Sequence, residues 1–445
     1  MTAGQEDVKT LAKGTGNKLR FGEFEVDLSN KDLRKNGRQI RLERKPFQVM
    51  ELLLRIRGRF VSRDELKRAL WPDLHVNFER SLNTAVNSLR KALGDSPQNP
   101  RYVETRQGLG YRLVAPVEEL TPAGKNLGTS ENCAKARFFL NKQTQADLHR
   151  ASAYLQAALH EDDRCVRAHA DMAETYCLTA RMNMSTAQEA GVRARELAVK
   201  AVDLDPYSAE AHAALGQVRH YFDWDWTGAF EEFERAVGLD TNCAAAHRAY
   251  GAFLSCRGSS RRAVEALRTA QTLEPVSAAI SAETAWALYV ARDFDAAHEQ
   301  CWKILALEPT FCAAQHVLGL VNEQMMMYDE AIIEFQNAQA SGDEQPAFIA
   351  AAGHAWAKAG MTAKAKETLR TLRGLARKRY VSPYWNAIVC TGLDQCEAAI
   401  GWLQKASEER DVWLTWMGVD PRLDELRTSA EFQALARRLD LDVAR

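Results

Sequence analysis

A fixed spacing of 34 residues dominates the chain after about residue 200 and limits what this region can fold into. An acidic residue followed by Pro or Thr recurs at Asp205, Asp240, Glu274 and Glu308. Small residues recur at Gly216, Gly251, Ala285 and Gly319, and again at Ala229, Ala263, Ala297 and Ala331. Every step is 34 residues, except for one step of 35 in each of the first two sets. An ordinary helical bundle would not keep such a period, so the pattern predicts helix pairs that bury their apolar faces against their neighbours.

Each period fits one helix–turn–helix unit. A small residue in each helix lets the two backbones approach, and a larger side chain four residues after the second small residue fills the remaining gap. The larger residues are Phe233, Leu267, Cys301 and Phe335. These spacings resemble the tetratricopeptide family, which implies an α-solenoid. The expected units are four between Ala209 and Asp343, two before them at Ala151–Ala158 and His169–Pro206, and two degenerate ones near Ala347–Arg379 and Ser382–Arg410. An amphipathic helix at Pro421–Leu439 is expected to cap the open end of the stack.

The resemblance also implies that the first helix of each unit lines a concave surface that binds a protein or peptide. In this register the surface includes His220, Tyr221, Arg248, Trp286, Tyr289, His316, Glu323 and Gln324. Aromatic and Arg side chains are typical anchors of such interfaces. The alternative for each residue is a packing role or a solvated position, and self-association of the array also stays open.

Histidines occupy the same position in three successive units, at His169, His212 and His247. A stacked column of histidines can bind a metal, but this position usually packs the two helices of a unit together. No Cys or carboxylate spacing supports a metal site, so we expect none. The aromatic cluster Phe222–Trp226 falls between two helices and is expected to anchor that turn.

The first 116 residues follow a different pattern, in which short strands alternate with helices. Apolar residues alternate in residues 19–27, which predicts a strand, and Asn36-Gly37 predicts the turn of a hairpin. Helices are expected at Lys45–Arg57, from the N-cap Ser62 to Trp71, and at Ser81–Leu93. Two short strands follow in residues 102–113, around Gly108 and Gly110.

The helix expected at Ser81–Leu93 has two chemically distinct faces. Its apolar stripe comprises Leu82, Val86, Leu89 and Leu93. The opposite face comprises Arg80, Thr84, Asn87 and Lys91, with Ser88 beside them and no acidic residue. Such side chains hydrogen-bond to base edges and phosphates, so this face is the candidate DNA-reading surface. The alternative is a solvated surface used for protein contact.

The ordered motifs of residues 19–115 resemble the OmpR/PhoB-type winged-helix DNA-binding domain. The motifs are the N-terminal strands, Ser62-Arg63-Asp64-Glu65-Leu66, Leu89-Arg90-Lys91-Ala92-Leu93 and the segment from Thr105 to Arg112. The resemblance implies that the last helix enters the major groove, with base-facing positions at Arg80, Thr84, Asn87 and Ser88. It implies mainly DNA-backbone contacts for Arg90, Lys91, Thr105, Arg106 and Tyr111. The loop Pro72–Glu79 matches a segment that meets RNA polymerase in some members.

Two features depart from the family pattern. Members often have Arg at the two central exposed positions of the last helix, where this chain has Asn87 and Ser88. The wing has Gln107 where Arg is common, with Arg106 displaced by one position. These changes leave the fold intact and leave the recognised DNA sequence open. We expect them to weaken affinity, because each lost phosphate contact lowers salt-dependent binding.

Charge separates the two regions. Residues 1–116 carry 23 basic and 14 acidic side chains, a net charge of +9, whereas residues 117–445 carry 35 and 45, a net charge of −10. A basic region joined to an acidic one indicates a nucleic-acid partner for the basic region. No apolar run suits a membrane helix, no secretory signal precedes the first strand, and the nine cysteines have no paired spacing. We therefore expect a protein of the reducing cytoplasm with no membrane partner.

These patterns together predict a one-component bacterial transcription regulator with an α+β head and an all-α body. The expected organisation is a flexible tail at 1–18, a winged helix-turn-helix domain at 19–116, a linker at 117–131 and the tetratricopeptide array at 132–445. Its partners would be double-stranded DNA, RNA polymerase and a protein or peptide bound by the array. The alternative is an adaptor whose winged helix contacts protein. We find no phosphate-loop, metalloprotease, nucleophile-elbow or dinucleotide motif, so no enzymatic activity, catalytic residue or cofactor is expected.

Overall fold

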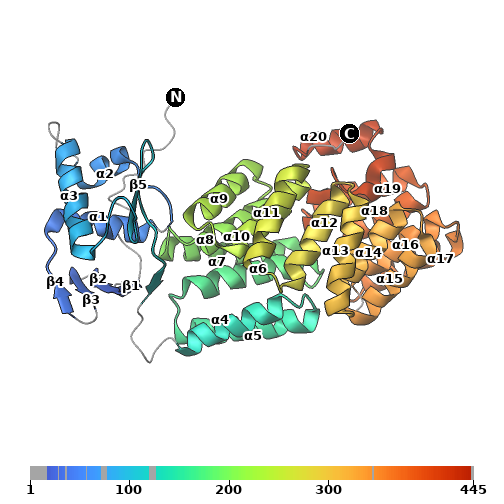
Figure 1. Ribbon diagram of the computed structural model, residues 1–445. Coiled ribbons are helices and arrows are strands. Elements are labelled where there is room, and N and C mark those ends of the chain that lie inside the picture. The colour runs from blue at the N-terminus through green and yellow to red at the C-terminus, as the bar shows by residue number, and fades with distance from the viewer. Residues whose placement is uncertain are drawn as a thin grey trace.

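The computed structural model describes residues 18–28, 30–35, 38–56, 58–71, 78–119, 127–342 and 345–441. A small α+β domain is followed by a long stack of helices (Figure 1). The multidomain fold expected from the sequence, a winged helix followed by an α-solenoid, is confirmed. Among these residues, no helix is both long and apolar enough to cross a membrane.

The N-terminal domain begins with an antiparallel sheet whose strands are ordered β4-β3-β2-β1-β7. The strands are β1 (Lys18–Phe21), β2 (Phe24–Asp27), β3 (Asp32–Lys35), β4 (Arg38–Ile40) and β7 (Val117–Glu119). Alternate side chains of β1 and β2 are fully buried, as the apolar pattern predicts. Lys35 pairs with Arg38 across the predicted hairpin. The Asn36-Gly37 turn itself lies outside the described residues.

Three helices and a second hairpin complete this domain: α1 (Arg44–Arg55), α2 (Arg63–Leu70), α3 (Phe78–Leu93), β5 (Val103–Arg106) and β6 (Gly110–Leu113). The Ser62 side chain accepts a hydrogen bond from the Glu65 amide, and the Glu65 carboxylate accepts one from the Ser62 amide. This reciprocal cap fixes the start of α2 where the sequence predicts it. The apolar stripe of α3 is buried, with Leu82 and Leu89 fully inaccessible.

Sixteen helices of the described array form eight antiparallel pairs, one pair for each expected unit. The pairs are α4 (Leu127–Leu140) with α5 (Gln145–Glu161), α6 (Val166–Arg181) with α7 (Ala187–Leu204), α8 (Ala209–Val218) with α9 (Trp226–Leu239), α10 (Ala244–Cys256) with α11 (Ser260–Leu273), α12 (Ala278–Val290) with α13 (Phe294–Leu307), α14 (Cys312–Gln324) with α15 (Tyr328–Ser341), α16 (Pro346–Lys358) with α17 (Thr362–Leu375), and α18 (Pro383–Gly392) with α19 (Cys396–Glu408).

The small residues of the repeat bring the two helices of a unit into contact, as the spacing predicts. A methyl group added to Gly216 would lie 2.8 Å from the ring of Phe233. The same addition to Gly319 would lie 2.5 Å from the ring of Phe335. The larger residue of the second helix therefore occupies the space that a side chain on the first helix would need.

The turns inside the units keep the same period. One residue in each turn has a left-handed backbone, and six of these residues follow at steps of 34: Trp224, Gly258, Arg292, Met326, Gly360 and Asp394. Between Gly216 and Trp224 the chain has one residue more than the next unit has between Gly251 and Gly258. The extra residue is accommodated by a π-helical turn at Arg219–Asp223, which extends α8. The aromatic cluster expected in this turn is therefore partly helical.

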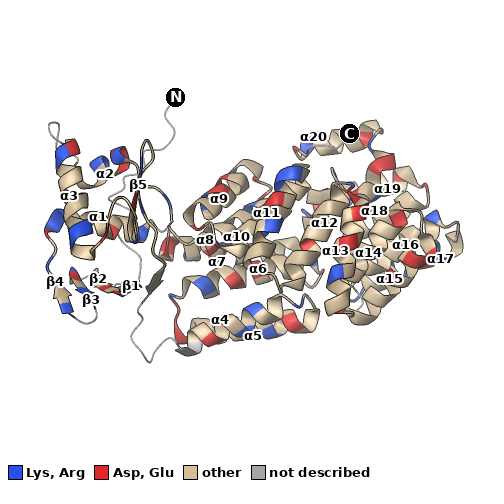
Figure 2. Ribbon diagram, viewed as in Figure 1, with Lys and Arg blue, Asp and Glu red and all other residues tan. Residues whose placement is uncertain are grey.

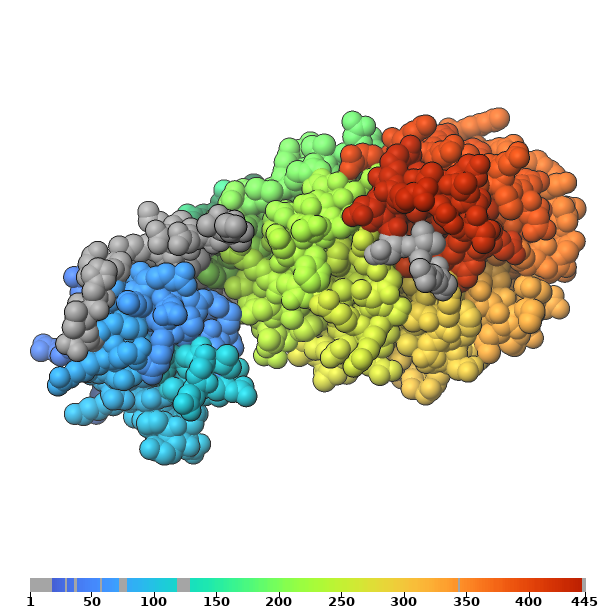
Figure 3. All heavy atoms as spheres, turned by 90° about the horizontal axis from the view of Figure 1, so that it is seen from above, coloured from blue at the N-terminus to red at the C-terminus, as the bar shows by residue number. Residues whose placement is uncertain are grey.

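The C-terminal residues differ from the single capping helix expected at Pro421–Leu439. They form two 3₁₀ segments, η3 (Val412–Trp416) and η4 (Pro421–Leu426), and a short helix α20 (Ala430–Arg438). The helix restarts because the Ser429 hydroxyl accepts a hydrogen bond from the Phe432 amide, which caps a new N-terminus. The segment 411–441, here the C-terminal segment, folds back against helices far earlier in the chain (Figure 3).

The expected linker at 117–131 is shorter at both ends in the structure. Val117–Glu119 pair with β1, and α4 begins at Leu127. Lys18, expected in the flexible tail, pairs with Asp27 at the start of β1. Residues 1–17 and 120–126 lie outside the described part of the chain.

Candidate nucleic-acid interface

The face of α3 that the sequence singles out is open to solvent. Arg80, Thr84, Asn87 and Lys91 are exposed, and Ser88 is half-buried. The hydroxyl of Thr84 donates to the carbonyl of Arg80 at 2.8 Å, so its lone pairs and methyl group remain available to a ligand. No acidic residue occurs between Arg80 and Lys91. Figure 2 shows Lys and Arg residues along α1, α2 and α3.

Arg90 has a different position from the DNA-backbone contact that the resemblance implies. Its guanidinium is buried, and Nη2 donates to the carbonyl of Val103 at 2.7 Å and to Thr105 Oγ1 at 2.8 Å. These bonds attach α3 to β5. The side chain therefore positions the last helix against the wing and is not free to reach a phosphate.

Tyr111 is also turned inward, with 3% of its surface exposed. Its hydroxyl accepts from Arg63 Nη2 at 2.8 Å and donates to Asn83 Oδ1 at 3.2 Å. Burial raises the pKa of this hydroxyl, so it stays protonated. Arg63 forms an ion pair with Glu79 as well, and the cluster joins α2, α3 and β6. The sequence shows Arg63 within a family motif and Glu79 at the end of a loop, and it does not predict this role for either residue, because only their proximity in space joins them.

The wing is the β5–β6 hairpin, with Gln107, Gly108 and Leu109 exposed at its tip. Its base is fixed by two backbone hydrogen bonds between Val61 and Tyr111, at 2.7 and 3.0 Å. Gly110 lies against the Val61 carbonyl with φ +110°, and a side chain there would clash. Within the described ranges no ion pair engages Arg80, Lys91 or Arg106, whereas Arg112 is held by Glu104. Exposed cations without a partner suit phosphate contacts.

Comparison with known proteins identifies a family for part of the N-terminal domain. Residues 37–113 match the family "Transcriptional regulatory protein, C terminal". Residues 37–113 are a domain of this family. The transcriptional regulatory protein KdpE of Mycobacterium tuberculosis is 34% identical over 92 residues, which is 21% of this chain and 41% of that protein. The transcriptional regulator HilA of Salmonella typhi is 30% identical over 130 residues, 29% of this chain and 23% of that protein.

The chain therefore spans less than half the length of these curated relatives. Among solved structures, a tetratricopeptide repeat protein from Parabacteroides merdae aligns with a TM-score of 0.34 at 12% identity. That alignment covers 70% of this chain and 99% of that protein.

The loop Pro72–Glu79 matches a segment that meets RNA polymerase in some members of the family. Most of this loop lies outside the described residues. Phe78 is described, and its ring lies edge-on to Trp71 at 5.6 Å.

Outside the transcriptional regulatory domain, the residues expected on the concave surface do not form an open groove. His220, Tyr221, Arg248, Tyr289, His316 and Glu323 are buried, and Trp286 and Gln324 are half-buried. The C-terminal segment covers part of this surface: the ring of Trp416 lies edge-on to Trp286 at 5.4 Å. Glu323 accepts a hydrogen bond from His354 Nδ1 at 2.8 Å. Side chains from the helices and the C-terminal segment together cover much of the surface that sequence alone would leave open, and a cavity remains between them.

The histidine column has a structural role in the units. Nε2 of His169, His212 and His247 lies 2.8, 2.9 and 3.0 Å from the carbonyl oxygen of the residue six positions earlier. Gln315 makes the same contact two units after His247, at 2.9 Å. Each side chain thereby fixes the loop that precedes its own helix. The described residues contain no group of three His, Cys, Asp or Glu side chains placed to hold a metal.

Proposed function

We propose that this protein is a DNA-binding transcription regulator whose N-terminal domain places α3 in the major groove. The observation that carries the proposal is the exposed, acid-free face of α3 within a transcriptional regulatory domain. In this arrangement Asn87 and Thr84 read base edges, with Arg80 and Ser88 beside them. Lys91, Thr105 and Arg106 contact phosphates. Arg90 and Tyr111 act by holding α3 and the wing in place.

The test uses the full chain and DNA fragments selected from a bacterial genomic library. Asn87→Ala should relax discrimination at one base pair, which corresponds to about 1–3 kcal/mol. Lys91→Ala should weaken binding to all fragments alike and lower the slope of log affinity against log salt by about 0.9. Lys303→Ala removes an exposed charge from α13 in the array and should change neither quantity.

If neither Asn87→Ala nor Lys91→Ala alters binding to any fragment, this face does not read DNA. Retention of a protein partner by the winged helix, without nuclease-sensitive DNA, would then favour the adaptor alternative.

We further propose that the array controls the regulator by binding a protein or peptide, or by self-association. The repeated helix pairs support this role, because such stacks present extended surfaces to partners. Contact of the loop at residues 72–79 with RNA polymerase rests on the sequence resemblance and remains part of this proposal.

A further inference from the structure

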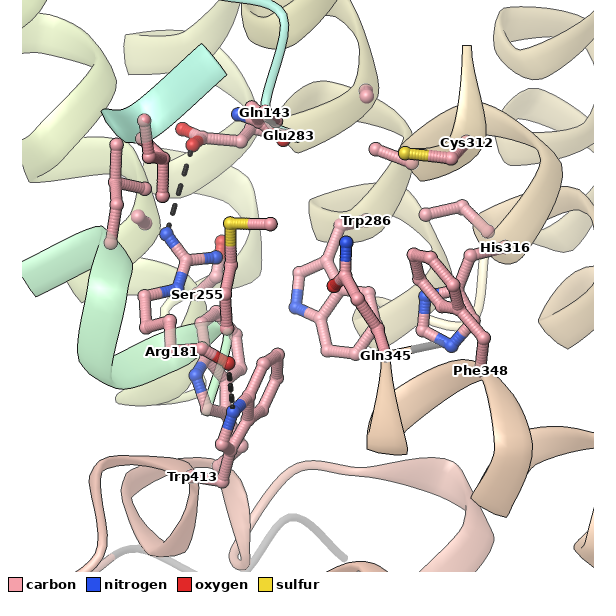
Figure 4. A pocket seen from close by; sticks show the side chains of 18 residues that line it. Gln143, Arg181, Ser255, Glu283, Trp286, Cys312, His316, Gln345, Phe348 and Trp413 are labelled. Atoms are coloured by element: carbon pink, nitrogen blue, oxygen red, sulfur yellow. Dashed lines mark hydrogen bonds and ion pairs between the residues drawn. The ribbon is translucent and has the colours of Figure 1, made fainter. Parts of the chain in front are cut away.

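A cavity lies between the first helices of the array and the C-terminal segment. Its volume is about 110 Å³, within a hollow of about 920 Å³ that includes open solvent, and no residue of the N-terminal domain lines it. Figure 4 shows Arg181 and Trp413 on one side and Trp286, Gln345, His316 and Phe348 on the other. The lining comes from the α4–α5 turn and from α5, α6, α10, α12, α14, α16 and η3, so segments spread over more than 200 residues converge here.

Aromatic side chains form one part of the walls of this cavity, beside aliphatic residues such as Leu178 and Met182. The ring of Trp286 lies 5.4 Å from Trp416 and 6.2 Å from Trp413, in both cases edge-on. The ring of His316 stacks against Trp286 at 6.3 Å and lies 4.9 Å from Phe348. These rings pack on one another, and the outer surface of the cluster favours contact with a flat, apolar ring system.

Three polar atoms of the lining have no hydrogen-bond partner in the described structure: Arg181 Nε, Trp286 Nε1 and His316 Nε2. His316 has only 6% of its surface exposed, and burial lowers the pKa of its ring to about 3, so the imidazole is neutral. The indole N–H can only donate. Buried polar groups of folded proteins nearly always have partners, so a missing partner at a cavity wall indicates a ligand atom that accepts from Trp286.

Charges around the cavity already balance one another. Arg181 Nη1 lies 3.9 Å from Glu283 Oε1, and Arg248 Nη1 lies 3.4 Å from the same oxygen. Arg248 also pairs with Glu174, which accepts from Arg137 at 3.2 Å, and Arg137 pairs with Asp171. Arg167 adds a further guanidinium 3.7 Å from Asp171, on the exposed side, and in the cavity wall itself Arg181 faces Glu283. A charged ligand would leave this buried network unbalanced, whereas a neutral one would not.

We propose that this cavity is a binding site for a small, neutral, planar aromatic molecule that carries a hydrogen-bond acceptor, such as a carbonyl oxygen. The aromatic walls hold the ring system, and the Trp286 indole N–H donates to the acceptor. The ligand binds to the array itself, so the site goes beyond the DNA-binding role proposed above.

The probe is coumarin, a neutral planar bicycle with a carbonyl acceptor, and the matched compound is indene, which has similar size and no acceptor. Calorimetric titration of the full chain should give a coumarin dissociation constant of about 1 mM or lower, and roughly tenfold weaker binding of indene. Trp286→Phe keeps an aromatic wall and removes the donor, so it should reduce coumarin affinity about tenfold and leave indene unchanged. Trp302→Phe, at an exposed tryptophan of α13, is the control and should change neither.

Ala313→Phe places a ring into the cavity and should abolish binding of both compounds. If that variant does not fold, the coumarin affinities of wild type and Trp286→Phe test the proposal by themselves. Absence of saturable coumarin binding, or equal affinity of wild type and Trp286→Phe for coumarin, would overturn the proposal. DNA binding is measured without coumarin. A negative result for coumarin binding therefore leaves the proposed DNA-binding function untouched.

Discussion

Arg90→Ala should destabilise the N-terminal domain without changing the salt dependence of DNA binding. The guanidinium is 7% exposed and donates to the Val103 carbonyl and to Thr105 Oγ1. A hydrogen bond from a charged donor contributes about 1.5–3 kcal/mol, and a buried carbonyl left without a partner costs about 1–3 kcal/mol. Thr105 is exposed and can turn to water, so the loss at Val103 dominates. We expect the free energy of unfolding of this domain to fall by about 3 kcal/mol.

Hydrogen exchange measured by mass spectrometry on the full chain resolves this domain from the array. The protection of amides in α3 and β5 should fall about 100-fold in Arg90→Ala, because each 1.4 kcal/mol is a factor of ten. Arg106→Ala is the matched control, since it removes an exposed arginine from the same hairpin. It should keep the protection and lower the salt slope of DNA binding by about 0.9. If Arg90→Ala instead keeps the protection and lowers the salt slope, Arg90 contacts a phosphate and the reasoning from its buried position is refuted.

Three further changes test the array. Gly319→Ala should destabilise the array by about 1–3 kcal/mol, because the added methyl group meets an aromatic ring. Gly238→Ala has open space around it and should stabilise α9 by up to about 1 kcal/mol. Urea unfolding that ranks the two variants in the opposite order would contradict the packing. His247→Gln should keep the loop contact that Gln315 makes elsewhere, whereas His247→Ala should lose about 1 kcal/mol in the same assay, and equal losses would argue against the contact. Burial raises the pKa of Asp411 from 3.8 to about 6, so this carboxyl stabilises the fold most below about pH 4 and the stabilisation is lost as the pH rises to about 6. The free energy of unfolding should therefore be about 3 kcal/mol lower at pH 7 than below pH 4 through this group alone. Asp411→Asn should remove this pH dependence from thermal unfolding. Parallel pH curves for wild type and variant would show that Asp411 does not cause it.

The parts of the structure that the sequence predicts are those set by contacts within one unit. The repeat predicts which small residue faces which larger one, and Gly216 does meet Phe233. In the same way, the 100° spacing of α3 predicts the buried stripe and the exposed positions Thr84 and Asn87. Both depend on local geometry, which periodicity determines. Whether the exposed positions contact DNA stays a prediction.

Periodicity does not determine where a long side chain on the flank of a helix points. Arg90 lies next to the apolar stripe, and its flexible stem can reach either inward or outward. The hydrogen bond to the carbonyl of buried Val103 holds it inward. The covering of the concave surface could not be predicted for another reason. Its contacts join residues about 200 positions apart, such as Trp385 Nε1 with Asn183 Oδ1 at 2.7 Å and Trp413 Nε1 with the Arg181 carbonyl at 2.8 Å. No repeat in the sequence records such pairs.

The position of the C-terminal segment restricts how a partner can use the concave surface. A peptide lying along the first helices would have to displace η3, which would expose the Trp416 ring and break the hydrogen bond from Trp413 to Arg181. It would also separate Arg292 from Asp424, which are joined at 2.7 Å. The free energy of these contacts would be subtracted from that of peptide binding, so a peptide must offer an equivalent aromatic anchor and donor to compete. A small molecule in the cavity needs no such exchange, because the segment forms one of its walls.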